Sequence, residues 1–514
     1  MLFSSNLFLY MFLPIVLGAY LACACAGRLT GLGRLQNMWL IVAGLFFYAW
    51  GATWFCGVLI LTILVDYAAG LAIAGAMPWG RAPIGPLSAF DERSWRQRAA
   101  LTASIAGNVG LLAFFKYFNF GVGSYNGLMR AIGLESLAWH TALRVALPLG
   151  ISFFTFQSMS YTIDVYLGRI AAARNLLDFM TYRTLFPVMV SGPIVRYESI
   201  AGELASRRVT LDDFAPGVRR FILGLGKKIL IANVLAVPAD AIFGLPPGQL
   251  TTPLAWLGAV CYTLQIYFDF SGYSDMAIGL GRMLGFHFPE NFNYPYVSRS
   301  ISEFWRRWHM SLSSWFRDYV FMPLNMAWRD WLRRGTAAAL MVTFLLTGVW
   351  HGANWTFVAW GVYHGALIVG ETLIGLDRKK GWQGRIGPLR NVYTMLAVVI
   401  GWVFFRAAGF EQALGFLRAM AGFGTGDPAV CYPALFLDGE TIAALIAALV
   451  FSMPVYPAAR EWLDRRLIGR EGFAAHAAET LYGLGQTALH IGILLVACVK
   501  LSATTHNPFI YFRF

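Results

Sequence analysis

Residues 337–375 read AAALMVTFLLTGVWHGANWTFVAWGVYHGALIVGETLIG. Two apolar runs, 337–352 and 355–375, meet at a short polar turn. A helix needs about 17 to 25 apolar residues to cross the hydrocarbon core of a bilayer, so the stretch predicts two neighbouring membrane-spanning helices. His351 lies next to the end of the first run, where an ionisable side chain is costly unless it has a partner or a function.

The whole chain has the composition of a membrane protein. Its 514 residues are 58% hydrophobic and only 13% charged, whereas a soluble globular domain carries about 25% charged residues. A soluble fold is therefore excluded. Together with the two runs above, ten others predict a polytopic all-α helix bundle of about 11 to 13 spans in one domain over residues 1–514. The ten are 7–26, 37–50, 55–75, 99–118, 146–166, 229–245, 253–271, 391–407, 439–456 and 482–503.

The positive charge of the chain lies in its loops. The net charge is +13, from 40 Lys and Arg against 27 Asp and Glu. Cytoplasmic loops of membrane proteins are enriched in Lys and Arg, so the basic loops predict the topology and not a nucleic-acid partner. They place the N-terminus outside, and Met1 to Ala26, which lacks a basic leader, is expected to stay as the first span. The basic residues of the first two such loops are Arg28, Arg34, Arg81, Arg93, Arg96 and Arg98.

Two stretches do not fit simple spanning helices. Residues 187–195, PVMVSGPIV, are apolar but short and contain two prolines and a glycine, which predicts a re-entrant or broken segment. Residues 265–324 mix aromatic residues, Gly, Pro, carboxylates and arginines between hydrophobic neighbours. Polar groups at membrane depth persist only against protein or water, so this region is expected to line the interior.

Two histidines are candidates for chemistry. His351 lies between two apolar helices, and because the unperturbed pKa of histidine is about 6.5, a neutral imidazole can accept a proton from an alcohol near neutral pH. A structural role, bonding two helices together, is an equal alternative for His351. His309 lies in SEFWRRWHMSLSSWFRD, residues 302–318, where an amphipathic interfacial helix is the more common explanation of the pattern. The face predicted to carry His309 also carries Ser302, Arg306, Ser313 and Phe316.

Charged residues cluster around these candidates. Arg306 and Arg307 could attract an anionic donor such as a nucleotide-bearing thioester. Asp269 and Asp275 end a predicted span, with Gly272 between them expected to bend the chain. The two carboxylates could orient a histidine, although ion pairing inside the bundle is the more frequent role. Asp66, a charge inside a span, needs no more than a structural partner.

The chain lacks the sequence motifs of several enzyme classes. The chain has no HExxH, no paired Cys and His at ligand spacing, and no CxxC among its six cysteines, so no metal site is expected. It has no GxSxG elbow, Walker loop or GxGxxG after a strand, which excludes the common hydrolase, ATPase and dehydrogenase readings. His364, on the helix after His351, could support a site there or could simply pack.

Three long motifs follow one another in the chain: QIYFDFSGYSDMAIGLGRMLGF, NFNYPYVSRSISEFWRRWHMSLSSWFRDY and LTGVWHGANWTFVAWGVYHG. They resemble motifs of the membrane-bound O-acyltransferase family, and within it the bacterial polysaccharide type represented by the alginate O-acetyltransferase membrane subunits. The likeness continues in MLFSSNLFLYMFLP, LPLGISFFTFQSMSYTIDVY, FPVMVSGPIVRY and the terminal NPFIYFRF, so it covers nearly the whole chain.

The resemblance implies a helix bundle around a central tunnel in the bacterial inner membrane, with a periplasmic N-terminus. His351 matches the catalytic histidine of the family and His309 its second characteristic polar position. Acetyl-CoA would be the cytoplasmic donor, with no permanently bound cofactor, and an exported polysaccharide the acceptor, directly or through a periplasmic acetyltransferase or carrier protein. The residues expected to bind substrate are Arg306, Arg307, Trp350, Asn354, Asp269, Asp275 and Tyr273.

One loop departs from the family, and other functions stay open. The polysaccharide branch usually continues after RDY with Gly-Gly-Asn-Arg, whereas this chain reads MPLNMAWRDWLRRG, so donor handling or partner docking is expected to differ. D-alanyl or other acyl transfer to a cell-wall polymer or lipid is an alternative within the family. A transporter or flippase without covalent chemistry, or a silent scaffold in a secretion complex, are alternatives of other classes.

Overall fold

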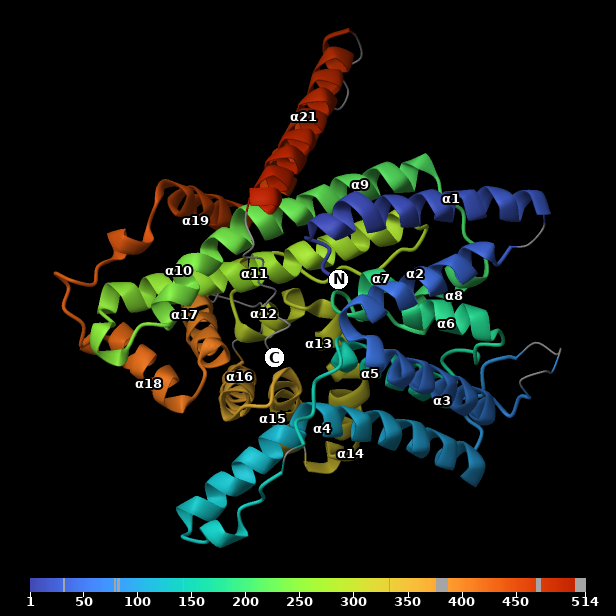
Figure 1. Ribbon diagram of the computed structural model, residues 1–514, viewed down its shortest axis with the longest axis horizontal. Helices are drawn as coiled ribbons and strands as arrows, with labels where there is room; N and C mark the ends of the chain where they lie inside the picture. The colour runs from blue at the N-terminus through green and yellow to red at the C-terminus, as the bar shows by residue number, and fades with distance from the viewer. Residues whose placement is uncertain are drawn as a thin grey trace. The chain divides into compact units, whose positions relative to one another are not determined.

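The computed structural model describes residues 1–30, 33–77, 80, 84–141, 143–331, 333–375, 387–467 and 473–503. Every regular element in these ranges is a helix, which confirms the predicted all-α membrane bundle (Figure 1). Arg81 and the terminal NPFIYFRF, both used in the sequence analysis, lie outside the described residues.

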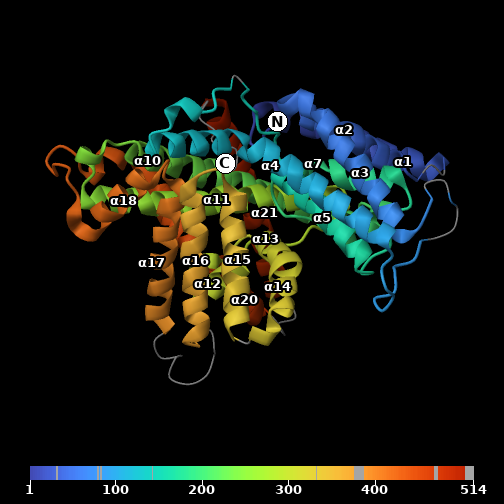
Figure 2. The same ribbon diagram turned by 90° about the horizontal axis from the view of Figure 1, so that it is seen from below.

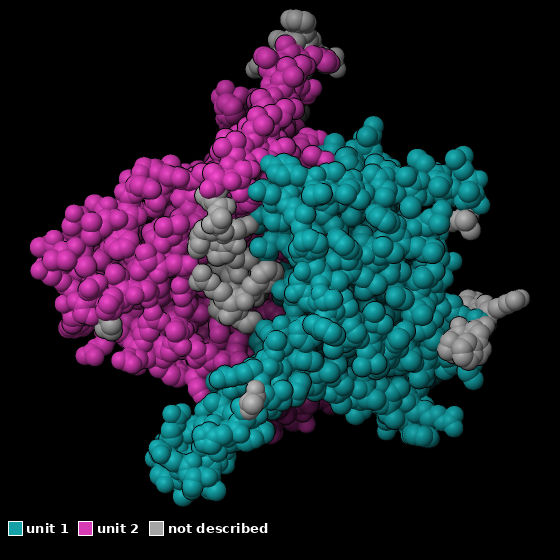
Figure 3. All heavy atoms as spheres, viewed as in Figure 1, with its two compact units in different colours: residues 1–217, 280–289 teal, residues 218–279, 290–514 magenta. Residues whose placement is uncertain are grey.

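The chain divides into two compact units (Figure 3). Unit 1 comprises residues 1–217 and 280–289, and unit 2 comprises residues 218–279 and 290–514. The single domain expected over 1–514 stays a prediction. Both candidate histidines belong to unit 2.

Unit 1 consists of the first eight α-helices with short π- and 3-10 turns between them. These are η1 (Phe8–Phe12), α1 (Leu13–Thr30), α2 (Leu35–Ala52), η2 (Thr53–Phe55), α3 (Cys56–Ala74), α4 (Trp95–Ala131), η3 (Glu135–Leu137), α5 (Ile151–Tyr166), α6 (Leu176–Thr184), α7 (Phe186–Met189) and α8 (Tyr197–Ala205). The first turns of α9 (Leu211–Gly226) also belong to it. Helix α7 ends at Met189 and Gly192 has φ 103°, so the predicted broken segment 187–195 is confirmed as broken.

Unit 2 contains the helices that carry the candidate site. Its first members are η4 (Lys227–Ala232), α10 (Asn233–Phe243), η5 (Pro247–Gln249), α11 (Thr252–Met283), η6 (Pro295–Val297), α12 (Ile301–Arg307), α13 (Met310–Phe316), η7 (Arg317–Phe321), α14 (Met322–Ala327) and η8 (Arg329–Trp331). They are followed by α15 (Arg333–His351), α16 (Trp355–Leu373), α17 (Gly387–Arg406), α18 (Phe410–Arg418), η10 (Ala419–Phe423), η11 (Pro433–Phe436), α19 (Gly439–Phe451), α20 (Val455–Leu467) and α21 (Phe473–Ala503).

Each predicted span overlaps one of these helices. In the described part of the chain, six helical segments are long and apolar enough to cross a membrane, or seven if the bent pair of α19 and α20 counts as one span. The chain is therefore a multi-pass membrane protein, and the number of 11 to 13 spans stays a prediction. The six are Phe8–Thr30, Leu35–Ala74, Trp95–Ala131, Leu211–Phe243, Gly387–Arg406 and His476–Ala503.

The bend predicted at Gly272 is wrong, because α11 runs through this position as one continuous helix. Gly272 instead lets the backbone of α9 approach. A Cβ atom at Gly272 would lie 2.8 Å from the carbonyl oxygen of Gly224, and one at Gly224 would lie 2.5 Å from that of Gly272. Glycine serves here for close helix contact and not for a turn.

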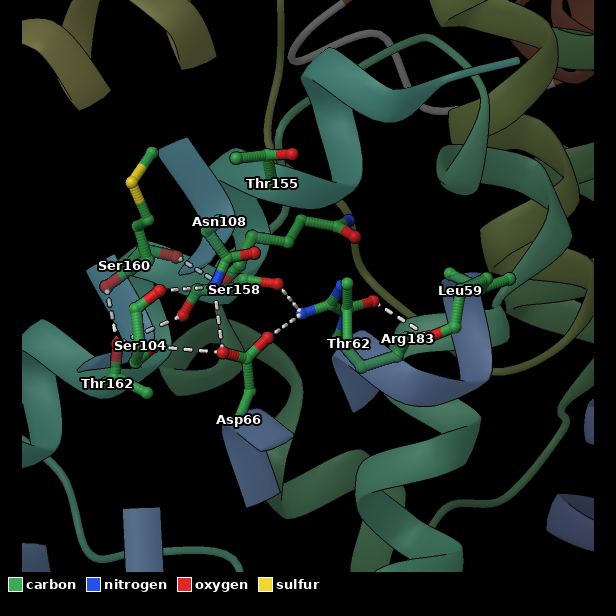
Figure 4. A network of polar contacts seen from close by, with 12 residues as sticks. Leu59, Thr62, Asp66, Ser104, Asn108, Thr155, Ser158, Ser160, Thr162 and Arg183 are labelled. Atoms are coloured by element: carbon green, nitrogen blue, oxygen red, sulfur yellow. Dashed lines mark hydrogen bonds and ion pairs between the residues drawn. The ribbon is translucent and has the colours of Figure 1, made fainter. Parts of the chain in front are cut away.

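A fully buried ion pair anchors the interior of unit 1 (Figure 4). The Arg183 guanidinium on α6 lies 3.3 Å from the Asp66 carboxylate on α3, and both side chains are 0% exposed. Asp66 also accepts hydrogen bonds from Ser104 and Asn108 of α4, each at 2.9 Å. Arg183 also donates to Ser158 of α5. The structural partner expected for Asp66 is thus Arg183, and the network joins four helices.

We expect Arg183→Met to destabilise the protein strongly, because it leaves a buried carboxylate without its counter-charge. Losing one partner of such a pair costs about 3–5 kcal/mol, whereas removing both charges costs much less. The double variant Asp66→Asn/Arg183→Met, whose amide can still accept from Ser104, should recover most of the loss. Unfolding in mixed micelles by SDS titration measures both free energies. Equal losses in the single and double variants would contradict a role for the ion pair.

His287 ties the 280–289 segment to the rest of unit 1. Its Nδ1 lies 2.7 Å from Glu203 and its Nε2 lies 3.3 Å from Asp213, and its backbone N–H also donates to Glu203 at 3.1 Å. These hydrogen bonds, first that to Glu203 and then that to Asp213, raise the pKa of His287 above its usual value. The charged imidazole is therefore favoured in the folded protein.

A raised folded-state pKa makes this contact stabilising at low pH and less so as the pH rises through that pKa. We expect His287→Gln to lower the melting temperature most at about pH 6, near the ordinary pKa of histidine. The difference from the unchanged protein should shrink toward alkaline pH. Differential scanning fluorimetry in detergent over a pH series measures it, with the exposed His140→Gln as control. A difference independent of pH would refute the assignment.

Candidate active site

Helices α15 and α16 form a tightly packed hairpin with His351 at its turn, and α17 lies along α16 (Figure 2). Glycines at the crossing allow this approach. A Cβ atom at Gly348 would lie 2.4 Å from the carbonyl oxygen of Phe357, and one at Gly361 would lie 2.5 Å from that of Phe344. No other residue fits these two positions without moving the partner helix.

His351 is buried in an aromatic cage formed by Trp350, Trp360 and Phe405. His351 is only 5% exposed. The imidazole centroid lies 4.9 Å from Trp350, 5.0 Å from Trp360 of α16 and 5.0 Å from Phe405 of α17. A cage of this kind keeps bulk water from the ring, which strengthens electrostatic interactions inside it.

His309 lies at a break between α12 and α13, so the continuous amphipathic helix predicted through it is wrong. Its φ of 43° and ψ of 54° are left-handed, a conformation that costs a residue other than glycine about 1–3 kcal/mol. Competing backbone hydrogen bonds explain the break. Asn293 N–H donates to Arg307 O and Met310 N–H donates to Asn291 O, both at 2.9 Å, which draws this part of the chain out of the helix.

Asn291 sets the tautomer of His309. The Asn291 side-chain oxygen accepts from the backbone N–H of Ser311 at 3.2 Å and from its hydroxyl at 2.9 Å, while its amide group donates to Ser274 at 3.0 Å. The atom that receives a backbone N–H must be an oxygen, and His309 Nδ1 lies 3.1 Å from that same oxygen. Nδ1 therefore carries the hydrogen, and in the neutral ring Nε2 carries the lone pair.

The two imidazoles lie on either side of Trp350. The Trp350 ring centroid is 6.4 Å from that of His309 and 4.9 Å from that of His351. His309 is 0% exposed and Trp350 is 5% exposed. Two histidines 42 residues apart in sequence are thus brought into one buried cluster.

A buried carboxylate from α16 holds α12 in place. Glu371, 2% exposed, accepts from the backbone N–H of Ile301 at 2.6 Å and from that of Ser302 at 3.0 Å. Asn391 of α17 donates to the carbonyl oxygens of Tyr296 and Ser298, at 3.0 and 2.9 Å. A negative charge at a helix N-terminus complements the helix dipole and satisfies its unpaired N–H groups. The position of His309 therefore depends on α16 and α17.

The candidate substrate-binding carboxylates and arginines have different surroundings. Asp269 is paired with Lys228, both at most 2% exposed, and Asp275 with Arg220 at 2.8 Å and Lys227 at 2.6 Å. Ion pairing, the more frequent role for such carboxylates, therefore describes both.

The two arginines differ. Arg307 binds Glu303 at 2.9 Å, whereas Arg306 is exposed and has no hydrogen bond or ion pair among the described residues. Arg306 is thus available to attract an anion, while Arg307 also stabilises its own helix.

Asn354 and Tyr273, two further candidates for substrate binding, are part of the packed structure of unit 2. Asn354 caps α16 by accepting from Thr356 N–H at 3.1 Å and donates to Ala408 O at 2.8 Å. Tyr273 is 4% exposed on α11. Contact of either residue with substrate stays a prediction.

The loop that departs from the family contains α14 and η8, and the rings of Trp328 and Trp331 stack there with their centroids 5.8 Å apart.

Sequence reasoning missed three residues that build the site. Asn291 and Glu371 orient His309 and α12 through contacts that no local pattern contains, and Trp360 reads as an ordinary apolar-helix residue. A buried Glu371 inside an apolar run was the one available signal, because an intramembrane carboxylate needs a partner. In the described ranges, no group of three or more His, Cys, Asp or Glu side chains is placed to hold a metal ion.

Several known proteins are similar in sequence to this chain, some of them over its full length. The model of the membrane-bound O-acyltransferase family, MBOAT, matches residues 167–410. The "Probable alginate O-acetylase AlgI" of Pseudomonas putida is 40% identical over 522 aligned residues, covering 100% of both chains. The peptidoglycan O-acetyltransferase of Helicobacter pylori is 33% identical, covering 82% of this chain and 80% of its own.

A more distant relative acts on another polymer. The teichoic acid D-alanyltransferase of Bacillus subtilis is 31% identical over 268 residues, covering 50% of this chain and 66% of its own. All three relatives are named as acyl-transferring enzymes, and the two longer matches are named as O-acetylating ones. The chain therefore belongs to the membrane-bound O-acyltransferase family and is a multi-pass membrane O-acetyltransferase.

Proposed function

We propose that this enzyme moves an acetyl group from cytoplasmic acetyl-CoA across the bacterial inner membrane to an exported polysaccharide, directly or through a periplasmic partner protein. Membrane O-acetylation of a polysaccharide follows from the family and its relatives. The observation that supports the site is the buried cluster of His309, Trp350 and His351. The donor, the partner and the residue roles are the proposed part.

His351 acts as the general base. Its imidazole removes the proton of the acceptor hydroxyl while the oxygen attacks the thioester carbonyl carbon, and the C–O bond forms. The C–S bond then breaks, and His351 returns the proton to the departing thiolate. The products are an acetyl ester and the free thiol, so the step needs no other reactant. The aromatic cage supports this role by keeping water from competing with the acceptor.

His309 positions the substrate. Its Nε2 lone pair can accept a hydrogen bond from an N–H or O–H group but cannot donate one to a developing oxyanion while the ring is neutral. The neutral His309 ring therefore does not serve to stabilise the negative charge that develops on the carbonyl oxygen. Exposed Arg306 fits attraction of the phosphate groups of coenzyme A, because guanidinium binds phosphate well.

D-alanyl transfer is the second candidate, and the Bacillus subtilis relative favours keeping it. The periplasmic side of the N-terminus, expected from the basic loops, and the cytoplasmic entry of the donor, expected from the family resemblance, belong to the first proposal. In D-alanyl transfer the acyl group carries an ammonium group, which would have to enter the aromatic cage around His351.

We expect His351→Ala to lose acetyl transfer by about 10²- to 10⁴-fold, the usual contribution of a general base. Purified protein in lipid nanodiscs, radiolabelled acetyl-CoA and an oligosaccharide acceptor measure the product. His140→Ala, an exposed histidine of unit 1, serves as the matched control and should retain full activity. Folding of both variants is checked by melting temperature.

Two outcomes would contradict the proposal. Transfer of D-alanine but not acetate by the unchanged enzyme would replace the donor assignment. Full acetylation by a folded His351→Ala variant would remove the histidine from catalysis and favour a scaffold.

A further inference from the structure

The buried face of α16 carries a polar stripe beside His351. Thr356, Trp360 and His364 follow one another at four-residue spacing, so they share one helix face over three turns. Their exposures are 0%, 0% and 1%. A face of a membrane helix buried this completely is ordinarily apolar, so the stripe calls for an explanation.

Each member of the stripe has a polar atom without a hydrogen-bond partner among the described residues. The atoms are Thr356 Oγ1, Trp360 Nε1 and His364 Nδ1. In folded proteins about 90% or more of buried polar groups are satisfied by protein or ordered water. Three exceptions on successive turns of one helix indicate that a polar group occupies this place when the enzyme works.

Below the turn that holds His351, the stripe lies beside the side of α16 that packs on α15. That side of α16 is closed by the glycine contacts, with Gly361 against Phe344 and Gly365 against Met341. The imidazole of His364 also has one edge closed, since a Cβ atom at Gly401 of α17 would lie 2.5 Å from its Nε2. The unpartnered atoms therefore belong to the part of α16 that contacts α12 and α17.

Trp360 is the member of the stripe next to His351. Its ring centroid lies 5.0 Å from that of His351 and 4.9 Å from that of His364, and the two ring planes of Trp360 and His351 are nearly perpendicular at 83°. Trp305 of α12 packs edge-on against Trp360 at 5.3 Å. The indole is held by packing on several sides, so its N–H direction is fixed before substrate arrives.

The proposed reaction lacks one component among the residues assigned so far. Acyl transfer needs a donor hydrogen bond to the carbonyl oxygen, which becomes negative as the hydroxyl attacks. His309 cannot supply it, because its Nδ1 hydrogen is bound to Asn291 and its Nε2 is an acceptor. His351 as a base likewise presents a lone pair.

We propose that Trp360 is a catalytic residue whose indole N–H donates a hydrogen bond to the carbonyl oxygen of the acyl group during transfer. This inference rests on the proposed function. As the acceptor oxygen bonds to the carbonyl carbon, the C=O electron pair moves onto that oxygen, where the indole N–H stabilises it. The pair returns when the C–S bond breaks, so Trp360 itself gains and loses no proton.

The test removes the N–H and keeps the ring. In Trp360→Phe, and in a variant with 3-benzothienylalanine at position 360, where sulfur replaces N–H at nearly the same shape, kcat should fall about 10²-fold, as for loss of one oxyanion donor. KM for acetyl-CoA should change less than about twofold, because the bond strengthens mainly in the transition state.

Trp256→Phe is the matched control. Its indole N–H donates to Met420 O at 2.9 Å in a structural contact away from the stripe, so this change should lower the melting temperature and leave kcat unaltered. An unchanged kcat in both Trp360 variants would overturn the proposal. The indole N–H would then donate to an aromatic ring or to a structural water instead. A change in KM alone would also overturn it. Absence of acetylation by the unchanged enzyme would instead contradict the proposed function.

Discussion

The contacts of Asn291 are the constraint on which the candidate site depends. One side-chain oxygen accepts from Ser311 twice and lies 3.1 Å from His309 Nδ1, and the backbone of the same residue pairs with Met310. Together these bonds break the helix at His309, hold its left-handed backbone and choose its tautomer. Local strain of about 1–3 kcal/mol persists at a site only when the surroundings over-determine it, and here they do.

The buried charged side chains of both units are stabilised by a partner, whereas some buried neutral polar atoms are not. In unit 1, Asp66 and Arg183 neutralise each other completely inside a hydrogen-bonded network. In unit 2, Lys228 with Asp269 and Glu371 with the α12 N-terminus do the same. Each pair joins helices that are distant in sequence, because charge left alone in a low-dielectric interior is prohibitively costly. By contrast, Thr356, Trp360 and His364 on the buried face of α16 each keep a neutral polar atom that has no hydrogen-bond partner in the part of the chain that the structure describes.

The sequence predicts the helices well, because the length of an apolar run is a local property. The broken segment 187–195 and the helical hairpin around His351 follow from local sequence in this way, whereas His309, for which an interfacial helix was the more common explanation, is fully buried. The bend at Gly272 and the continuous helix through His309 failed for one reason: both depend on a partner segment, α9 for Gly272 and residues 291–293 for His309. Asn291 and Trp360 were missed since their roles exist only after folding.

The proposed role of His351 requires the acceptor hydroxyl to lie between its imidazole and the carbonyl carbon of a thioester, inside the aromatic cage of Trp350, Trp360 and Phe405. This arrangement can be measured in a structure of the enzyme bound to an acetyl-CoA analogue in which a methylene group replaces the sulfur, so that the thioester becomes a ketone. We expect the carbonyl carbon within about 6 Å of a His351 ring nitrogen, because the acceptor oxygen must fit between them, roughly 3 Å from the nitrogen and roughly 3–3.5 Å from the carbon. An analogue bound with its carbonyl outside the cage, while His351 stays enclosed by aromatic rings, would contradict it.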